Sequence, residues 1–315
     1  MKLTRRSFLR YSGLVFAGMN VSSSVLAALE RQLAKATKPP VLWLNGSSCT
    51  GCSVSFLNRI ADSAPETAAD VLVSTIDLIY HPTLMAAAGD AAASVLLRAY
   101  HEGGYILVLE GGVPTAFNGN ACVVYSINGE EVTYMQAVTE LAAKAAVIVC
   151  VGTCASFGGI PAAGPNPTEV VSIHELTGRP VVNLSGCPVN PDWVVWGLAN
   201  LIAGAPVELD GDFRPMALYN RDLAGASVPA LIHDKCPRNS SVNPSAPPEA
   251  TDFGQDGRCL INLGCRGPAT KARCEGCWNG KAGQANWCIG VNAPCHGCVE
   301  PTFPGPESFY QTYTV

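Results

Sequence analysis

The 315-residue chain has few charged residues, because Asp, Glu, Lys and Arg make up only 14% of it, against roughly 25% in an average soluble domain. Aromatic residues are also scarce, at 7%. With 48% hydrophobic residues, the chain cannot be intrinsically disordered. This composition favours a large permanent interface or a membrane segment over a solitary monomer. No basic tract follows the N-terminus, which argues against a nucleic-acid partner.

Residues 1–36 are predicted to be a twin-arginine export signal. The paired-arginine string Thr4-Arg5-Arg6-Ser7-Phe8-Leu9-Arg10 precedes a moderately apolar stretch at 11–29, and Ala34-Lys35-Ala36 is a cleavage site of the A-x-A type. The alternative is an ordinary basic flank before an apolar helix. No run of about 20 apolar residues occurs later in the chain, so we expect a periplasmic mature protein without a transmembrane segment.

Residues 38–205 are predicted to form a doubly wound parallel α/β sheet. Apolar runs rich in Val and Ile lie at 41–44, 71–76, 106–109, 147–151 and 181–184. Stretches with helical character lie between or after them, notably at 83–100, 134–145 and 192–202. Short apolar runs that alternate with helical stretches are typical of such a sheet.

Residues 206–315 are predicted to form a second, irregular domain. Proline, glycine, asparagine and cysteine dominate this part, and no long periodic segment occurs in it. Eight of the fourteen cysteines lie in the last 80 residues. A loop-rich region of this kind needs disulfides or metal centres to hold it together.

A first group of four cysteines follows the predicted strands. Cys49 and Cys52 come after the first strand, Cys154 after the fourth and Cys187 after the fifth. Because doubly wound sheets bind ligands at the carboxyl ends of their strands, we expect these thiols to converge. One Cys-x-x-Cys pair joined by two distant cysteines favours an iron–sulfur cluster over structural zinc, which more often uses two close pairs. Two disulfides are the remaining alternative for an exported protein.

Two further groups lie in the C-terminal part. The second group is His233, Cys236, Cys259 and Cys265. His233 stands three residues before a cysteine in a predicted loop, so it is either a fourth ligand or an ordinary polar residue with its hydrogen bonds satisfied. The third group is Cys274, Cys288, Cys295 and Cys298, and a proline follows its Cys-x-x-Cys pair closely, as in many ferredoxin-type loops. Spacing alone leaves Cys277 as a competitor of Cys274.

Two other cysteines stay outside these groups. Cys150 lies within an apolar strand and is interpreted as a small core residue, and Cys122 has no assigned role. Glu110 ends the third strand at the same edge as the first group. It is either a residue that supports the metal site or simply an acid before a Gly-Gly turn.

From about residue 40 to the C-terminus, the chain resembles the small subunit of periplasmic nickel–iron hydrogenases. The resemblance rests on the combination of these strings and not on any one of them: Cys49-Thr-Gly-Cys52-Ser, Glu110-Gly-Gly-Val-Pro-Thr, Gly152-Thr-Cys154-Ala-Ser-Phe-Gly-Gly, Gly186-Cys187-Pro-Val-Asn-Pro, His233-Asp-Lys-Cys236-Pro, Leu263-Gly-Cys265-Arg-Gly-Pro and Cys295-His-Gly-Cys298-Val-Glu-Pro. It implies a flavodoxin-like first domain and three iron–sulfur clusters in a row.

The resemblance also implies which residues hold each cluster. The first group would hold the proximal [4Fe-4S] cluster and the second group the distal [4Fe-4S] cluster. The third group would hold the medial cluster, and the string Gly267-Pro-Ala-Thr270 favours Cys274 over Cys277. Many family members have a proline where this chain has Cys288 and carry a three-iron medial cluster. With cysteines at 288 and 122, the chain resembles the nickel–iron–selenium subgroup. This resemblance predicts a [4Fe-4S] medial cluster with Cys288 as a ligand. Without Cys288 as a ligand, a [3Fe-4S] cluster is expected.

The implied function is electron transfer within a hydrogenase heterodimer. A separate large subunit would split dihydrogen, and this chain would carry the electrons to a periplasmic c-type cytochrome. Two other functions stay open at this point. One is an electron-transfer subunit of a respiratory complex that uses a single cluster. The other is a periplasmic binding protein stabilised by disulfides or zinc.

Overall fold

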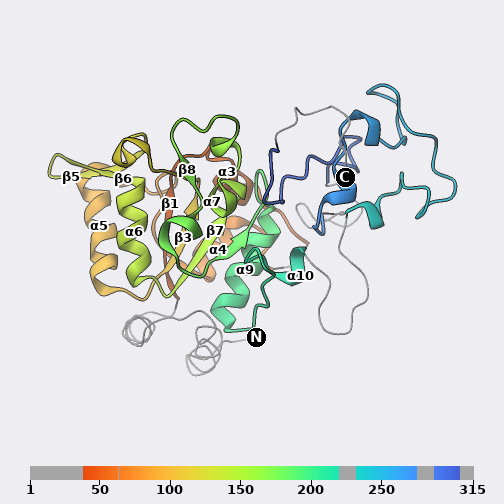
Figure 1. Ribbon diagram of the computed structural model, residues 1–315. Coiled ribbons are helices and arrows are strands. Elements are labelled where there is room, and N and C mark those ends of the chain that lie inside the picture. Colours follow the sequence, from red (N-terminus) through yellow and green to blue (C-terminus); the bar gives the residue numbers. More distant parts are fainter. Residues whose placement is uncertain (1–37, 63, 220–231, 275–286, 306–315) are drawn as a thin grey trace.

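The computed structural model describes residues 38–62, 64–219, 232–274 and 287–305 (Figure 1). The predicted export signal at 1–36 and Cys277 lie outside the described residues.

A five-stranded parallel sheet forms the centre of the N-terminal part. Its strands are β1 (Pro40–Asn45), β2 (Asp77–Tyr80), β3 (Ile106–Glu110), β7 (Val147–Val151) and β9 (Val182–Leu184). They are arranged in the order β2-β1-β3-β7-β9, and all four pairings are parallel. Counted along the chain, this is the order 2-1-3-4-5 of flavodoxin-like sheets. The predicted fold class is confirmed.

Helices cover both faces of this sheet (Figure 1). Helices α5 (Gly89–Glu102) and α6 (Tyr134–Lys144) lie on one face, and α3 (Gly51–Leu57), α4 (Ala68–Ser74) and α9 (Pro191–Ala203) lie on the other. Side chains alternate between the two faces along each strand. In β1, for example, Leu42 and Leu44 pack toward α5 and α6, whereas Val41 and Trp43 pack toward the other helices. Burial on both faces explains the continuous apolar runs in the sequence.

The strand predicted at 71–76 is wrong, because most of that run belongs to α4. Thr67 and Asp70 form a capping box in which each side chain accepts a hydrogen bond from the other residue's backbone N–H, and this starts a helix. Val71 points into the core, but Val73 is 70% exposed, as expected on a helix and not on a buried strand. The strand follows as β2, at the edge of the sheet. The helix expected from residue 83 begins later, at Gly89.

Shorter elements complete the described part of the N-terminal region. Strands β4 (Val113–Pro114) and β8 (Val170–Val171) form one antiparallel pair, and β5 (Val123–Ile127) and β6 (Glu130–Thr133) form another. The helical elements are α7 (Thr153–Phe157), α8 (Ile173–Thr177), α10 (Met216–Tyr219) and the 3₁₀ turns η1 (Ala116–Gly119) and η2 (Ile160–Ala162). The β5–β6 hairpin was not predicted, although its turn contains the dipeptide Asn128-Gly129, both residues of which have positive φ.

The C-terminal part is irregular in its described ranges, 232–274 and 287–305. The only elements there are the 3₁₀ turns η3 (Ile232–Lys235), η4 (Ile261–Leu263) and η5 (Gly267–Ala269). Its buried residues, among them Ile232, Leu260 and Val299, belong to the same hydrophobic cluster as the α3/α4/α9 face of the sheet. The chain therefore has one continuous core across the predicted boundary, and the domain limits 38–205 and 206–315 stay a prediction.

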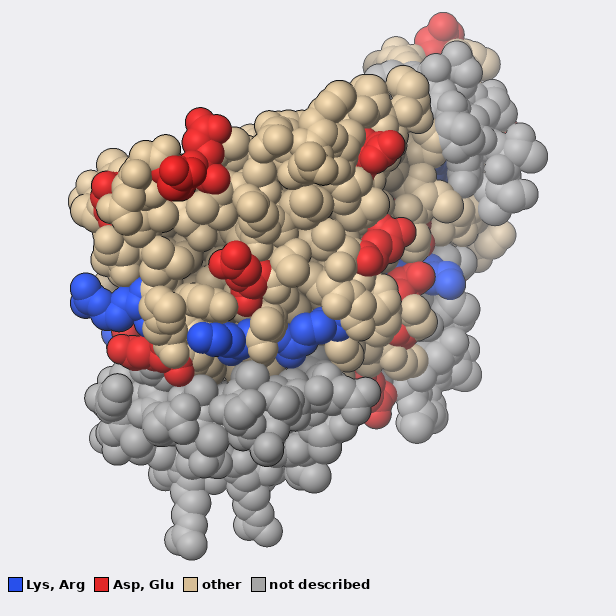
Figure 2. Space-filling model, turned by 60° about the vertical axis from the view of Figure 1, so that its left-hand side comes forward, with Lys and Arg blue, Asp and Glu red and all other residues tan. Residues whose placement is uncertain are grey.

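Few charges interrupt the surface on the α5/α6 side, where Lys and Arg form a row along the lower edge (Figure 2). Helices α3 and α7, which follow the carboxyl ends of β1 and β7, lie toward the top of Figure 1. Within the described residues, no helix combines the length and apolar character needed to cross a membrane.

Candidate metal centres

The first group of cysteines lies at the carboxyl ends of the central strands, as the sequence predicts. Cys49 and Cys52 follow β1 at the start of α3, Cys154 lies in α7 directly after β7, and Cys187 follows β9. Thr50 adopts a left-handed backbone conformation between Cys49 and Cys52. This edge is where doubly wound sheets bind their ligands.

The four thiols of the first group affect one another electrostatically. Burial raises the pKa of Cys52, and the charges of Glu110, Cys154 and Cys187 raise it further. Burial also raises the pKa of Cys154 to about 12, with smaller contributions from Cys187 and Cys49. The thiols of Cys52 and Cys154 are therefore costly to ionise together. A cationic metal centre would supply the missing counter-charge, because metals bind cysteine as thiolate.

Glycines keep the space around these thiols open. Gly152 has a φ of 85°, and a Cβ atom built on it would lie 2.4 Å from Sγ of Cys52. A Cβ on Gly51 would lie 2.9 Å from Sγ of Cys49. The backbone N–H of Val189 donates a hydrogen bond to Sγ of Cys52 over 3.5 Å. Close backbone approach and N–H donors to sulfur are features of iron–sulfur sites.

Glu110 lies directly behind Cys52 and is 1% exposed. Its carboxylate accepts hydrogen bonds from the backbone N–H groups of Cys52 (3.0 Å) and Ser53 (3.2 Å), from the Ser53 hydroxyl (2.5 Å) and from Nε1 of Trp43 (3.3 Å). The carboxylate thus fixes the first turn of α3, which carries Cys52.

The second group lines a single pocket in the C-terminal part. His233, Cys236, Cys259 and Cys265 all contribute to its wall, together with apolar residues such as Leu260 and Ile289. Burial raises the pKa of both Cys236 and Cys259, and each thiol is further affected by the charge of Cys265. One imidazole and three thiols around one cavity are a donor set suited to a metal cluster.

The third group lies between the other two. Burial raises the pKa of Cys298 to about 12, and the charges of Cys288 and Cys187 raise it further. Cys295 is buried, and its thiol lies 3.4 Å from Oγ1 of Thr270. Cys288 is an exposed residue.

Direct contacts join the three groups in a row. The backbone N–H of Cys187 in the first group donates a hydrogen bond to Sγ of Cys298 in the third group. At the other side, the backbone N–H of Cys295 donates to Sγ of Cys265 in the second group over 3.3 Å. The order in space is therefore first, third and second, although the order in sequence is different.

The three donor groups consist of thiols and one imidazole, which are the ligand types of iron–sulfur clusters. Among the described residues, no three His, Cys, Asp or Glu side chains lie close enough to share one ion. A zinc ion would need its thiolates at about 2.3 Å, whereas a cluster of several irons spreads its ligands around a larger core. No disulfide joins any of the described cysteines. The residue types present therefore fit iron–sulfur clusters.

The remaining described cysteines lie elsewhere. Cys150 is fully buried in β7, on the α5/α6 face, as expected for a core residue. Cys122 packs against the same core.

Several residues of these sites were missed from the sequence. Gly152 directly precedes Thr153 and Cys154 in the sequence, but only the structure shows that a Cβ on Gly152 would meet Sγ of Cys52. Trp43 and Ser53 look like ordinary strand and helix residues. Arg214 holds the C-terminal part through a network of ion pairs. The close spacing of Asp210, Asp212 and Arg214 was the one available signal for that network.

Two family models match the chain in adjoining regions. Residues 49–201 match "NADH ubiquinone oxidoreductase, 20 Kd subunit". Residues 229–311 match the model of the C-terminal region of the NiFe/NiFeSe hydrogenase small subunit. The first region contains the first group, and the second region contains the other two.

Relatives match over nearly the whole chain. The periplasmic [NiFeSe] hydrogenase small subunit of Desulfomicrobium baculatum is 35% identical, over 98% of this chain and 99% of the relative. The periplasmic [NiFe] hydrogenase small subunit of Solidesulfovibrio fructosivorans is 34% identical, over 96% of this chain and 90% of the relative. Among solved structures, the recombinant [NiFeSe] hydrogenase of Desulfovibrio vulgaris Hildenborough matches with a TM-score of 0.75 and 37% identity, covering 87% of this chain and 98% of that one.

Proposed function

Since the chain belongs to the family of nickel–iron and nickel–iron–selenium hydrogenase small subunits, we propose that it carries electrons through three iron–sulfur clusters between a large subunit and a c-type cytochrome. As a member of this family it is the subunit of a hydrogenase heterodimer that lacks the nickel site. The observation that carries the proposal is the row of donor groups, joined by the Cys187–Cys298 and Cys265–Cys295 contacts.

Each donor group would hold one cluster. The first group holds the proximal [4Fe-4S] cluster, the third group the medial cluster and the second group the distal [4Fe-4S] cluster. When bound, such clusters supply one-electron carriers. The chain's own residues keep the sites in line, exclude water from Cys52 and Cys295, and donate backbone hydrogen bonds to the sulfur atoms of Cys52 and Cys265.

Cys288 would complete the medial site as its fourth ligand. Its charge raises the pKa of Cys298, which supports a position beside the rest of the third group. Four thiolates allow a full [4Fe-4S] cluster, whereas Cys274, Cys295 and Cys298 alone would hold [3Fe-4S]. We expect a Cys288→Ser variant to lose about one iron per heterodimer while keeping the other two clusters.

The large subunit would dock on the edge that carries the first group. Large apolar side chains are exposed around that edge, including Val54 and Leu57 on α3 and Phe117 and Ile160 in the neighbouring 3₁₀ turns. Such a patch marks an interaction surface. The low charge content of the chain agrees with a large permanent interface.

The exit for electrons would be the second group. A groove beside it is lined by His233 and Cys259 and by the polar residues Arg238, Asn239 and Glu249. A neutral imidazole leaves less negative charge at a surface cluster than a thiolate would. We assign this groove to the periplasmic c-type cytochrome that accepts the electrons. The paired arginines at 5 and 6 would direct export of the folded, cluster-loaded protein to the periplasm.

Metal analysis of the complex, purified without oxygen from its native host, tests the proposal. We expect nickel near one and about thirteen irons per heterodimer, counting three cubanes and the iron of the nickel site. One selenium would identify the selenium subgroup. A count of about twelve irons would agree with the proposed function but would mean that Cys288 is not a cluster ligand. About four irons without nickel would favour the single-cluster alternative, and zinc or no metal would overturn electron transfer altogether.

A further inference from the structure

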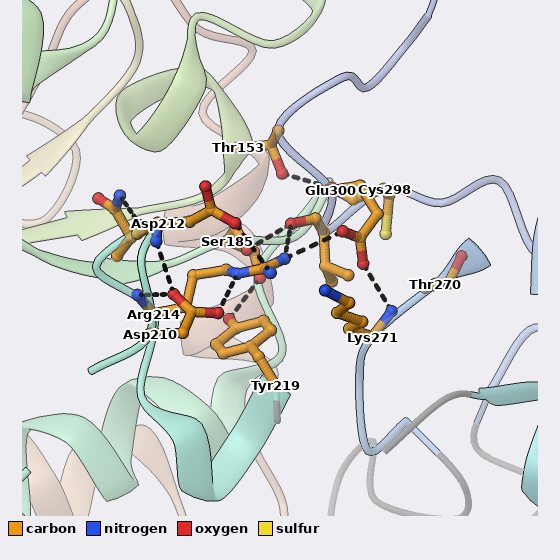
Figure 3. A network of polar contacts seen from close by, with 12 residues as sticks. Thr153, Ser185, Asp210, Asp212, Arg214, Tyr219, Thr270, Lys271, Cys298 and Glu300 are labelled. Atoms are coloured by element: carbon orange, nitrogen blue, oxygen red, sulfur yellow. Dashed lines mark hydrogen bonds and ion pairs between the residues drawn. The ribbon is translucent and has the colours of Figure 1, made fainter. Parts of the chain in front are cut away.

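Arg214 is a buried cation, 1% exposed, that holds three carboxylates (Figure 3). Its Nε donates to Asp210 Oδ2 over 3.0 Å, its Nη2 to Asp212 Oδ2 over 3.1 Å, and its Nη1 to Glu300 Oε2 over 3.2 Å. A buried guanidinium is tolerated only where partners replace the water that it loses. We call Arg214, Asp210, Asp212 and Glu300 the Arg214 network.

The Arg214 network lies against the third group of donors. Glu300 is two residues beyond Cys298 in the sequence. The guanidinium carbon of Arg214 is 5.4 Å from the ring centre of Tyr219. Burial raises the pKa of Tyr219, and the charges of Cys274 and Cys298 raise it further, so the same ring also lies near these two thiols.

The network also fixes the chain between two donor groups. The carbonyl oxygen of Val299 accepts hydrogen bonds from Nη1 of Arg214 (3.2 Å) and from Oγ of Ser185 (2.8 Å). Tyr219 donates its hydroxyl to the carbonyl of Ser185 over 2.7 Å. Ser185 precedes Cys187 of the first group by two residues, and Val299 directly follows Cys298 of the third group. These contacts connect the segments that carry the two cysteines (Figure 3).

We propose that Arg214 is a positioning residue that sets the reduction potential of the centre held by the third group and fixes that centre beside the first group. The inference rests on the proposed function, because it requires a redox centre in the third group. An added electron is stabilised by a nearby positive charge and destabilised by a nearby negative one. The sign of each charge in the network therefore predicts the direction in which its removal moves the potential.

The two central members of the network give opposite predictions. Arg214→Gln removes the cation and leaves three carboxylates, so the medial centre should become harder to reduce. Glu300→Gln removes one carboxylate, so the centre should become easier to reduce. Arg214→Lys keeps the charge but loses the multiple hydrogen bonds, and its potential should stay near that of the wild type. A residue that only held the fold would not produce opposite shifts.

The test is a redox titration of the intact heterodimer, purified without oxygen and followed by electron paramagnetic resonance. We expect Arg214→Gln to lower, and Glu300→Gln to raise, the equilibrium constant for one-electron reduction of the medial centre by about tenfold. This corresponds to about 59 mV in each direction. The control is Arg179→Gln, because the Arg179 guanidinium bonds the backbone carbonyls of Ala142 and Ala145 at the far end of α6.

The outcomes separate this inference from the proposed function. A wild-type complex without a medial signal would refute the proposed function. A normal wild-type signal with unshifted potentials in both variants, or with shifts of the same sign, would refute the role of Arg214. If the Arg214→Gln heterodimer does not assemble, the titration is made on Asp212→Asn instead. The Asp212 side chain is 43% exposed, so removing its charge disturbs the packing less. Asp212→Asn should then shift the potential upward, as Glu300→Gln does, and no shift in either would also refute the role.

Discussion

Gly152 combines two constraints that no other residue type can meet. Its φ of 85° is unfavourable for residues with a side chain, and a Cβ would lie 2.4 Å from Sγ of Cys52. With a ψ of 158°, this backbone conformation is essentially confined to glycine and costs about 1–3 kcal/mol for alanine. We expect Gly152→Ala to displace Cys52 as well, and so to lower the iron content of the purified heterodimer by about four per complex, as for one lost cubane.

Gly129 provides the matched control for that substitution. It has a φ of 82°, but no atom lies within 4 Å of the Cβ that alanine would add. Gly129→Ala therefore also places a side chain at a positive φ, but without touching a thiol. If both variants keep the full iron content, or lose it equally, the close contact with Cys52 does not matter for the cluster.

His81 predicts a pH dependence of stability. Burial lowers its pKa from 6.5 to about 4. Between these two values the unfolded chain binds more protons than the folded one, so stability is complete above pH 6.5 and falls as the pH drops toward 4. The effect amounts to at most about 3 kcal/mol. His81→Phe can still pack on Trp43, whose ring centre is 5.1 Å away, but cannot titrate.

The corresponding measurement is the melting temperature of the heterodimer without oxygen at pH 7.5 and pH 5. We expect the difference between the two values to be smaller in His81→Phe than in the wild type. An equal or larger difference would mean that His81 does not contribute to acid sensitivity.

At the scale of elements, α4 shows what sequence patterns can and cannot predict. The apolar run at 71–76 predicted a strand, but the capping box of Thr67 and Asp70 starts a helix there. We expect Thr67→Ala to destabilise the protein by about 1 kcal/mol through loss of the cap. Thermal melting would measure this loss. Thr139→Ala, in the middle of α6 and exposed, is the control that should change stability less. Equal effects would mean that the cap is unimportant.

The contrast between α4 and the central strands has a physical cause. Strands β1, β3 and β7 are covered on both faces, so their sequences are continuously apolar and could be predicted closely. The edge strand β2 is only partly covered and begins with an exposed aspartate, so its pattern is weak. The Thr67-x-x-Asp70 pattern that starts α4 is present in the sequence, and the cap overrides the apolar run that follows it.

The same limit applies to the candidate sites. The positions of the predicted strand ends were sufficient to place the first group at one site, because parallel strands share one carboxyl edge. For the C-terminal part, no periodic element allowed such an inference. The contacts of Cys298 with Cys187 and of Cys295 with Cys265 depend on loop paths, which spacing does not encode. The order of the three groups was an expectation from resemblance, and the contacts now support it physically.

At the scale of the whole molecule, the exposed apolar residues at the first group distinguish one end of the sheet from the other. Val54 lies on α3 beside Cys52 and is 50% exposed. Val73 is 70% exposed, but it lies near the amino end of the sheet, where its carbonyl accepts a hydrogen bond from Lys38. Two exposed valines thus lie at opposite ends of the same sheet.

This difference gives a test of where the large subunit docks. Val54→Glu would bury an unpaired charge if the interface covers α3, and an unpaired buried charge is strongly unfavourable. We expect the variant to fail to co-purify with the large subunit, whereas Val73→Glu should co-purify like the wild type. Size-exclusion chromatography of extracts that contain both subunits measures the outcome. Because the carboxylate at 54 would stay in water if α3 were free, a stable heterodimer of Val54→Glu would require the large subunit to dock elsewhere. The first group would then no longer be the place where electrons enter the chain.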